Sequence, residues 1–527
     1  MKKTSPLIFA ILLVIVLTVT TTSASYPDVN PPELVFIIPV GPNGVQYHGG
    51  RPEMLTWGPT AFAIAPDGSF WIADTVGNRL LHYSSQGKAL NTINLKDHQV
   101  VGIGDLKITA SNILVLDIAA IIPRVLRLSP DGKLLASYQV PKEWGIANGL
   151  SGFAVGDQGQ VLIEREGGAF VSQLADANGK VAPVALDRYT QHGRQYKASP
   201  ADLTAANATR GHIIVNDKHI EVNVTHSLGG LRLLGVNADD DFFAVVDEVA
   251  IADSGVQVDQ TVRHYNAAGE LQGLARVPLA EQYTHVAHGL AVSPDGGVYA
   301  LVTRPDRVEV QRLRFSRELK PILPAASAGE KNLQNNEYNG AAVLGCVTRD
   351  SMISTALGYI NNVKYLSLTN TDGTCAGRGK PRYITGAGDY PSVSYDWGGW
   401  DTVSQFNGYM DPGTLQAGDV GTGTVENCSR GDDCSGFVTV VWQLTTKYST
   451  RMIPSVSKKL RSTSALLPGD VMNEAGSHVV LFSSFGSNGI YDYESTTYNG
   501  NDRVIYMFST WARLKGYSPL RFNNVCP

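Results

Sequence analysis

The feature that most constrains the fold is a recurring unit of short apolar strands separated by tight turns. Its first copy runs from Ala61 to Asp74 as two strands around the turn Pro66-Asp67-Gly68. Apolar residues recur at every second position in these strands, which is the strand period. Asp-Gly supplies the positive φ that a tight hairpin turn needs. The unit therefore predicts paired antiparallel strands.

Weaker copies of this unit follow along the chain, with similar turns at Pro130-Asp131-Gly132 and Pro294-Asp295-Gly296. Their spacing is irregular but near the roughly 40–50 residues of one propeller blade. Because one unit cannot bury its apolar face alone, several have to stack around an axis. The segment 66–88 resembles an NHL repeat, so we expect residues 33–318 to form an NHL-like, all-β propeller of about six blades. A pair of β-sandwiches or a β-solenoid is the alternative.

The first 25 residues have the order of a secretory signal peptide. Lys2 and Lys3 precede an apolar run from Leu7 to about Val19, and small residues follow at 22–25. The run is short for a bilayer span of about 20 residues, so we expect cleavage rather than an uncleaved anchor. The mature protein is then expected to be secreted or in the cell envelope, with no membrane span.

The length of 527 residues predicts two or three cores. Small residues and prolines at 319–340 favour a linker, which places a second, cysteine-bearing domain at 341–527. The net charge is -5, so nothing indicates a surface for nucleic acid. No cluster of His, Cys and Asp has the spacing of metal ligands, and we expect no metal and no cofactor.

All five cysteines lie in the last third of the chain: Cys346, Cys375, Cys428, Cys434 and Cys526. In an oxidising compartment paired cysteines become disulfides, and an odd number leaves one thiol as a candidate nucleophile. The sequence does not assign the pairs. Our working assignment is Cys346–Cys375 and Cys428–Cys526, which leaves Cys434 free. A bond between Cys428 and Cys434 would instead inactivate an enzyme built on Cys434.

Two segments of the last domain carry candidate chemistry. Cys434 precedes apolar residues at helical spacing, so it is expected at a helix N-terminus, where N–H groups and the dipole stabilise a thiolate or an oxyanion. His478 opens an apolar strand after a Gly-Ser turn and would act as the base for Cys434. A third polar group should orient the imidazole. The next strand offers Glu494 and Asp492 on one face, of which we prefer Glu494.

The strings Tyr395–Gly399, Asp433–Val438, Leu467–Val471 and Ser477–Val479 follow one another in this order. In combination they resemble the NlpC-type papain-like peptidases that cut bacterial cell-wall peptides. The resemblance covers roughly residues 395–494. It implies an α+β papain-like fold for 341–527 and an acyl-enzyme mechanism on a cell-wall peptide.

The resemblance also assigns roles to single residues. Cys434 becomes the nucleophile, His478 the base and Glu494 the orienting residue. Tyr395 matches a tyrosine that assists the oxyanion or holds substrate. Asp433 matches a residue that receives a substrate amine in members cutting near a free N-terminus, and Ser435 would line the same pocket.

One departure from the family is an insert, residues 400–432, between the Tyr395–Gly399 string and Cys434. We expect it to form a disulfide-tied loop over the cleft that restricts the substrate. The propeller is expected to bind a glycan, a protein or the wall and so to place the hydrolase. The alternatives are an amidase or acyltransferase on the same scaffold, and a binding protein whose hydrolase part is silent.

Overall fold

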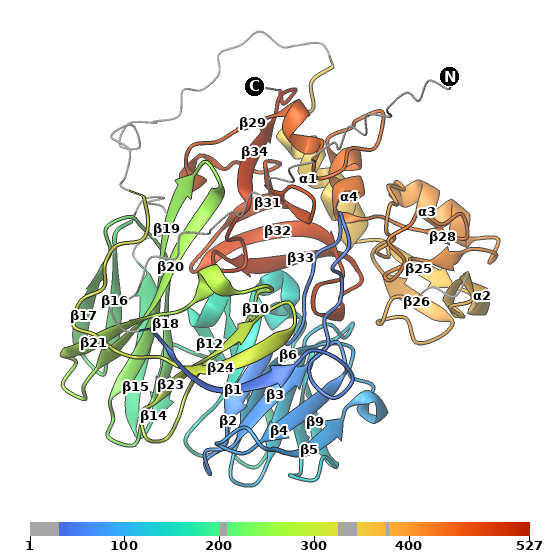
Figure 1. Cartoon of the computed structure of the whole chain (residues 1–527). Coiled ribbons are helices and arrows are strands. Elements are labelled where there is room, and N and C mark those ends of the chain that lie inside the picture. The colour runs from blue at the N-terminus through green and yellow to red at the C-terminus, as the bar shows by residue number, and fades with distance from the viewer. Residues whose placement is uncertain (1–30, 201–207, 325–344, 376–378, 527) are drawn as a thin grey trace, which may run out of the picture.

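The computed structural model describes residues 31–200, 208–324, 345–375 and 379–526 (Figure 1). The predicted signal peptide and most of the predicted linker lie outside these ranges. Within them, no helix combines the length and apolar character needed to cross a membrane. The chain first forms a ring of β-sheets and then a set of helices with a larger sheet that lies across the top of the ring in Figure 1.

The ring consists of six four-stranded antiparallel sheets, each made almost entirely of consecutive strands. This is the arrangement of propeller blades, so the predicted β-propeller is confirmed. The first three sheets are β2 (Ala61–Ile64), β3 (Phe70–Asp74), β4 (Arg79–Tyr83) and β5 (Ala89–Asn94); β6 (Ile103–Ile108), β7 (Ile113–Asp117), β8 (Arg124–Leu128) and β9 (Leu134–Gln139); β10 (Leu150–Val155), β11 (Val161–Arg165), β12 (Phe170–Ala175) and β13 (Val181–Leu186).

The other three sheets complete the ring. They are β14 (Tyr189–Gln191), β15 (Arg194–Pro200), β16 (Arg210–Val215) and β17 (Lys218–Asn223); β18 (Ser227–Val236), β19 (Phe242–Ala252), β20 (Gly255–Tyr265) and β21 (Leu271–Arg276); β22 (Leu290–Val292), β23 (Val298–Thr303) and β24 (Arg307–Arg312) with β1 (Glu33–Pro39). The last sheet thus takes its outer strand from the start of the chain, where Glu33 pairs with Arg312. This pairing closes the ring and covers an edge that would otherwise be open.

The alternation read from the sequence packs one blade against the next. In the first blade Trp71 and Leu80 are buried in one cluster with Leu106 and Val115 of the second blade. The turn between β2 and β3 is held by Asp67, whose Oδ1 accepts hydrogen bonds from the N–H and hydroxyl of Ser69. Local turn chemistry and blade-to-blade burial therefore agree in this part of the chain.

The second half of the chain has four helices and a six-stranded sheet among the described residues. The helices are α1 (Arg349–Ile360), α2 (Leu368–Thr371), α3 (Val403–Met410) and α4 (Cys434–Val441). The sheet has the order β29-β34-β30-β31-β32-β33, with strands β29 (Ser457–Lys459), β30 (Val471–Glu474), β31 (His478–Gly486), β32 (Gly489–Thr496), β33 (Arg503–Thr510) and β34 (Ser518–Phe522). Buried apolar side chains of α4, such as Phe437 and Val441, pack in one cluster with Val479 of β31.

A small lobe lies beside α4, at the right of Figure 1. It contains α2, α3, the pair β25 (Val363–Leu366) and β26 (Gly388–Pro391), and the pair β27 (Gln416–Ala417) and β28 (Ser429–Arg430). The insert 400–432 therefore folds into this lobe as α3, β27 and β28.

The two halves of the chain share a hydrophobic core. One cluster joins Val256 and Leu279 of the propeller to Val480, Phe482 and Leu514 of the C-terminal part, all buried. Strand β20 of the propeller also bonds directly to the end of the chain, since Val256 N–H donates to the carbonyl of Tyr517 at 2.8 Å. The C-terminal part is therefore fixed on the propeller by apolar burial as well as by hydrogen bonds.

The structure corrects the disulfide assignment. The bonds are Cys346–Cys526 and Cys375–Cys428, and Cys434 is free. Both working pairs were wrong because they were chosen without knowledge of long-range contacts. A bridge between Val347 and Val525 brings the first pair together. Cys428 is bonded to Cys375, so it is not bonded to Cys434.

Candidate active site

Cys434 is the first residue of α4, as the helical spacing predicts, and its thiol is buried. The helix begins there because Asp433 caps it: Oδ1 accepts the backbone N–H of Gly436 at 2.7 Å. The sulfur thus lies at a helix N-terminus, where unpaired N–H groups and the dipole favour negative charge.

The resting thiol is protonated. Burial raises the pKa of the Cys434 thiol above its ordinary value, and the Asp433 carboxylate adds to the rise. The backbone N–H of Val479 donates to the sulfur and acts in the opposite direction. Because Val479 follows His478, this contact also places the sulfur at the start of β31. The thiol needs a base to become a nucleophile.

His478 is the first residue of β31 and is buried. Its Nε2 lies 2.5 Å from Oε2 of Glu494 on β32, and Nη2 of Arg513 donates to both Glu494 oxygens at 2.8 and 2.9 Å. Burial raises the pKa of Glu494, but Arg513 and His478 outweigh it and bring the pKa down to about 2. Glu494 is therefore ionised at neutral pH and holds Nε2–H of His478, which leaves Nδ1 to accept a proton.

Of the two acids considered for orienting the imidazole, Glu494 is the one bonded to it. Asp492 is also fully buried, two residues earlier on the same face of β32. Burial and the neighbouring Glu494 raise the pKa of Asp492 well above its ordinary value. Burial therefore favours the uncharged form of Asp492, which lies beside the Glu494–Arg513 pair.

The Asp433 carboxylate is fully occupied within the protein. Oδ1 accepts from the Ser435 hydroxyl at 2.9 Å as well as from Gly436 N–H, and Oδ2 accepts from Gly398 N–H at 2.9 Å and from the Lys447 ammonium. Ser435 is buried beside Asp433. Lys447, however, takes the position at which a substrate amine was expected.

Tyr395 is buried close to the thiol. Its backbone bonds to Asp502 and Asp419, both in loops near the site. Burial raises the pKa of the Tyr395 hydroxyl well above its ordinary value, and Cys434 is the next contributor. The Tyr395 hydroxyl therefore remains a neutral hydrogen-bond donor.

Gly436 of the motif is needed for close packing. A Cβ on Gly436 would lie 1.9 Å from the carbonyl oxygen of Gly399. Helix α4 can therefore approach the Tyr395–Gly399 loop only with glycine at 436. This contact brings the two motif segments, separated by the insert, next to each other.

A propeller segment enters the site. The loop between β1 and β2 carries Glu53, whose N–H donates to the carbonyl of Gly476 at 2.9 Å and whose Oε2 accepts from Thr450 N–H at 2.9 Å. Gly476 lies two residues before His478 in the turn between β30 and β31. Glu53 also contributes to the raised pKa of Cys434. The propeller therefore supports the turn that presents the histidine.

A cavity of about 250 Å³ lies between the two halves, beside this cluster. Ser477, Arg513 and Tyr517 line it from the C-terminal part, and Tyr283 and His285 line it from the propeller. The ring of Tyr517 meets His478 edge to face, with centroids 6.5 Å apart. This is space for a bound group next to the histidine.

Sequence reasoning missed three residues of this cluster: Arg513, Lys447 and Glu53. None stands in a motif, since Arg513 follows β33, Lys447 follows α4, and Glu53 belongs to the propeller. Only three-dimensional proximity identifies them. Within the described ranges, no three His, Cys, Asp or Glu side chains gather in a way that would hold a metal ion.

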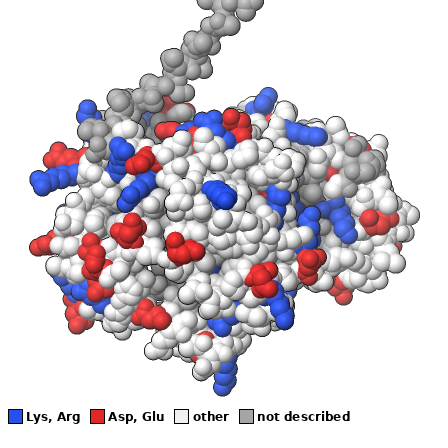
Figure 2. Space-filling model, turned by 60° about the horizontal axis from the view of Figure 1, so that its bottom comes forward, with Lys and Arg blue, Asp and Glu red and all other residues white. Residues whose placement is uncertain are grey.

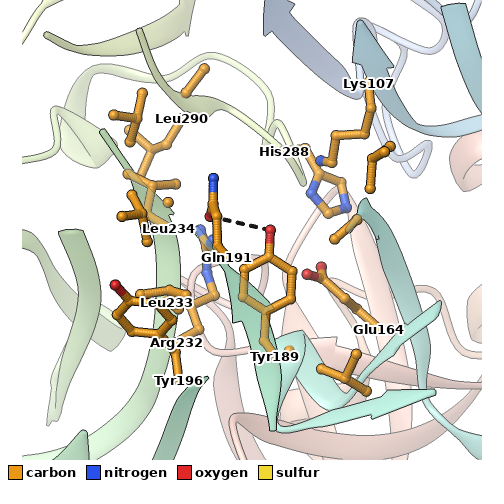
Figure 3. Close-up of a pocket in the computed structure, with 18 of the residues that line it drawn as sticks. Lys107, Glu164, Tyr189, Gln191, Tyr196, Arg232, Leu233, Leu234, His288 and Leu290 are labelled. Atoms are coloured by element: carbon orange, nitrogen blue, oxygen red, sulfur yellow. Dashed lines mark hydrogen bonds between the residues drawn. The ribbon is translucent and has the colours of Figure 1, made fainter. Parts of the chain in front are cut away.

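A second cavity, of about 340 Å³, lies on the axis of the propeller (Figure 3). Charged and polar side chains reach it from five blades: Lys107 on β6, Glu164 on β11, Tyr189 on β14, Arg232 on β18 and His288 just before β22. Apolar walls come from Leu233, Leu234 and Leu290. The cavity is a pocket for a small molecule by size.

The comparisons with known proteins concern the propeller. Residues 35–267 match a family described as a domain of unknown function, DUF7485. No curated protein matches the sequence. Structures similar to this chain include a streptogramin B lyase (12% identity, 53% of this chain and 98% of that chain, TM-score 0.31) and a member of the DUF4221 family from Bacteroides vulgatus (9%, 55% and 99%, 0.33).

A virginiamycin B lyase from Staphylococcus aureus is similar at 12% identity over 48% of this chain and 94% of that chain, with a TM-score of 0.29. Likenesses of this size add nothing to the assignment of the fold, which rests on the six sheets and their closure.

Proposed function

We propose that this protein is an extracytoplasmic cysteine hydrolase that cuts an amide bond in bacterial cell-wall peptides. Cys434 is the nucleophile, His478 the base and Glu494 the residue that orients the base. The propeller holds the C-terminal part and binds wall material. The resemblance to NlpC-type peptidases supplies the substrate class.

The observation that carries the proposal is the buried line Arg513–Glu494–His478 beside a free thiol at a helix N-terminus. Burying three such groups has a desolvation cost, which their contacts with one another offset. Nucleophilic catalysis needs a base that is fixed in this way. The ionised Glu494 stabilises the imidazolium that forms when His478 takes the thiol proton.

The proposed reaction has two stages, acylation of Cys434 and hydrolysis of the thioester. His478 takes the proton of Cys434, and the thiolate attacks the scissile carbonyl carbon. The N–H groups at the start of α4 and the neutral Tyr395 hydroxyl stabilise the oxyanion. His478 returns the proton to the leaving amine, and a water activated by His478 hydrolyses the thioester. No cofactor takes part.

The ion pair between Lys447 and Asp433 affects which kind of substrate the site would take. Because the Lys447 ammonium already neutralises Asp433, a substrate needs no free amine to complete the site. We therefore propose cleavage inside a peptide or of a blocked amide rather than release of an N-terminal residue. An amidase or acyltransferase shares this chemistry, and the acceptor, water or an added amine, distinguishes it.

The location outside the cytoplasm is supported by the two disulfides among the described residues, which are typical of oxidising compartments. Figure 2 shows Lys and Arg interspersed with Asp and Glu over the face that it presents. With a net charge of -5, this mixture supports a glycan or protein partner rather than nucleic acid.

The test uses the mature protein, from about residue 26, and Cys434→Ala with defined cell-wall peptides and whole peptidoglycan. We expect new peptide termini, read by mass spectrometry, from the wild type alone. Equal products from both proteins would contradict the proposal.

A binding protein with a silent hydrolase part is the second candidate, favoured by one observation: the Cys434 thiol is only 2% exposed. Alkylation of Cys434 distinguishes the hydrolase from the binding protein. A thiol that reacts with iodoacetamide in the folded protein is accessible to a substrate, whereas absence of both labelling and products leaves the function with the propeller.

A further inference from the structure

Two charges of opposite sign face the axial cavity of the propeller without a partner. Arg232 and Glu164 both line it, and neither forms a hydrogen bond or ion pair through its side chain with another described residue. Each affects the pKa of the other, while Lys107 acts more strongly on Glu164 and Asp247 acts more strongly on Arg232. Figure 3 shows both side chains beside Tyr189 in the same pocket.

The other charged side chains around the cavity have partners within the protein. Lys107 donates to both oxygens of Asp105 at 2.9 and 3.0 Å. Lys197 pairs with Asp187 at 2.6 Å. His288 lies 3.6 Å from Asp105, and burial lowers its pKa, so it is neutral.

Asp247, behind Arg232 on β19, is buried, and its Oδ1 accepts from the Gln260 amide at 2.8 Å. Burial raises the pKa of Asp247, and it raises the pKa of Glu164 in the same way. A ligand cation beside Glu164 and a ligand anion beside Arg232 would each stabilise the charged form of the group that it meets.

Leaving such charges unpaired is unfavourable. Both residues are half-buried and face the cavity, and burial disfavours the charged form of each side chain unless an opposite charge lies beside it. Burial raises the pKa of Glu164 and lowers that of Arg232, which is the same penalty seen at each group. A fold that keeps both groups in one pocket is complementary to a ligand that carries both charges.

We propose that the axial cavity binds a small zwitterion of the amino-acid type, whose carboxylate pairs with Arg232 and whose ammonium pairs with Glu164. The guanidinium fork suits a carboxylate, and a carboxylate suits an ammonium. The walls formed by Leu233, Leu234 and Leu290 fit a small apolar side chain. A volume of about 340 Å³ admits a free amino acid or a dipeptide with both ends free.

Arg232 and Glu164 also border a smaller cavity that Arg513 lines, so binding is tested in protein that lacks the Cys434 thiol. The experiment titrates full-length mature Cys434→Ala protein by calorimetry and thermal shift. The probes are D- and L-alanine, D-alanyl-D-alanine and L-alanyl-L-alanine, with N-acetylalanine and alaninamide as analogues that carry one charge each. At least one zwitterion is expected to bind saturably, and its single-charge analogues to bind about tenfold or more weakly.

Two variants assign the binding to the pocket. Glu164→Gln and Arg232→Met are each expected to lower the affinity for the zwitterion by about tenfold or more. Arg314→Met, an identical substitution at an exposed outer position (54% exposed), and Glu143→Gln are the matched controls and should bind as the parent does. The double variant Glu164→Gln/Arg232→Met should show a higher Tm without ligand than the parent, because two uncompensated charges are gone.

Three results would overturn the proposal. They are no saturable binding of any zwitterion to the parent protein, equal binding of the single-charge analogues, or unchanged binding in Glu164→Gln. The first two are read on the parent alone, so a folding defect in a variant does not obscure them. Cleavage assays on wild-type protein report on the hydrolase separately.

Discussion

At the scale of single residues, the site depends on one ionised acid. Glu494 accepts from His478 and from Arg513, and its pKa is brought to about 2 although burial opposes this. The acid therefore keeps its charge throughout the pH range in which the hydrolase would work. In the proposed mechanism it fixes the imidazole and stabilises its charged form.

Replacing this acid should reduce activity strongly. We expect Glu494→Gln to lower kcat/KM by roughly 10²- to 10⁴-fold, the usual size for removing the group that supports a catalytic base. Asp492→Asn is the matched control, because Asp492 is equally buried on β32 but is not the acid bonded to His478. Peptide-cleavage kinetics measure both, and a similar loss in the two variants would argue against a specific role for Glu494.

The same carboxylate should affect acid stability. A pKa lowered from 4.5 to about 2 by folding contributes stability that is complete above about 4.5 and is lost as the pH falls through about 2. The stability difference between wild type and Glu494→Gln should therefore shrink between pH 4.5 and 2. Urea unfolding at several pH values measures it. A constant difference would show that folding does not shift the pKa of Glu494.

At the scale of elements, the disulfide Cys375–Cys428 ties the lobe that contains the insert. It closes a loop of 53 residues, so its loss should cost about 2–4 kcal/mol in the unfolding free energy. The double variant Cys375→Ser/Cys428→Ser tests this by denaturant unfolding, with hydrogen exchange to locate the change. Increased exchange at 403–410, rather than in the propeller, is the expected pattern.

The sequence predicted elements well where local chemistry and packing agree. The Asp67-Gly68 turn and the alternation around Trp71 predicted blades because each blade is built from neighbouring strands. Cys434 was predicted at a helix start from the spacing of apolar residues. The disulfides, Arg513 and Lys447 were not predictable, because their partners are set by contacts between distant segments.

The insert shows the same limit. Residues 400–432 were expected to form a disulfide-tied loop over the cleft; the disulfide Cys375–Cys428 does tie them, and they form α3, β27 and β28 in the lobe beside α4. Asp419 of the insert bonds to the backbone of Tyr395, and the propeller loop with Glu53, which the sequence did not indicate, supports the turn before His478. A motif gives the residues of a site, but not which distant loop packs on it.

At the scale of the whole molecule, the propeller and the C-terminal part act as one body. They share a buried apolar cluster that includes Leu279 and Phe482. Residues 341–527 expressed alone would expose this surface, so we expect low solubility and weak protection from hydrogen exchange relative to the full chain. A well-folded, active fragment would contradict a structural role for the propeller.

Glu53 tests the same dependence inside the intact protein. Glu53→Ala would leave the buried Thr450 N–H without its acceptor, at a cost of about 1–3 kcal/mol, and would loosen the turn before His478. We expect a lower Tm and reduced kcat/KM, with Glu53→Gln close to wild type because its amide oxygen still accepts. Loss of activity in Glu53→Gln alone would mean that the charge, not the hydrogen bond, matters.

The most direct test of the central claim is to trap the acyl-enzyme. Wild type and Cys434→Ser are mixed with a defined cell-wall peptide and quenched in acid. The masses of their tryptic peptides are then measured by mass spectrometry. The account predicts a transient mass increase, equal to the acyl portion of the substrate, on the peptide that contains Cys434 in the wild type only. Cleavage products without that adduct, formed equally by Cys434→Ser, would contradict it.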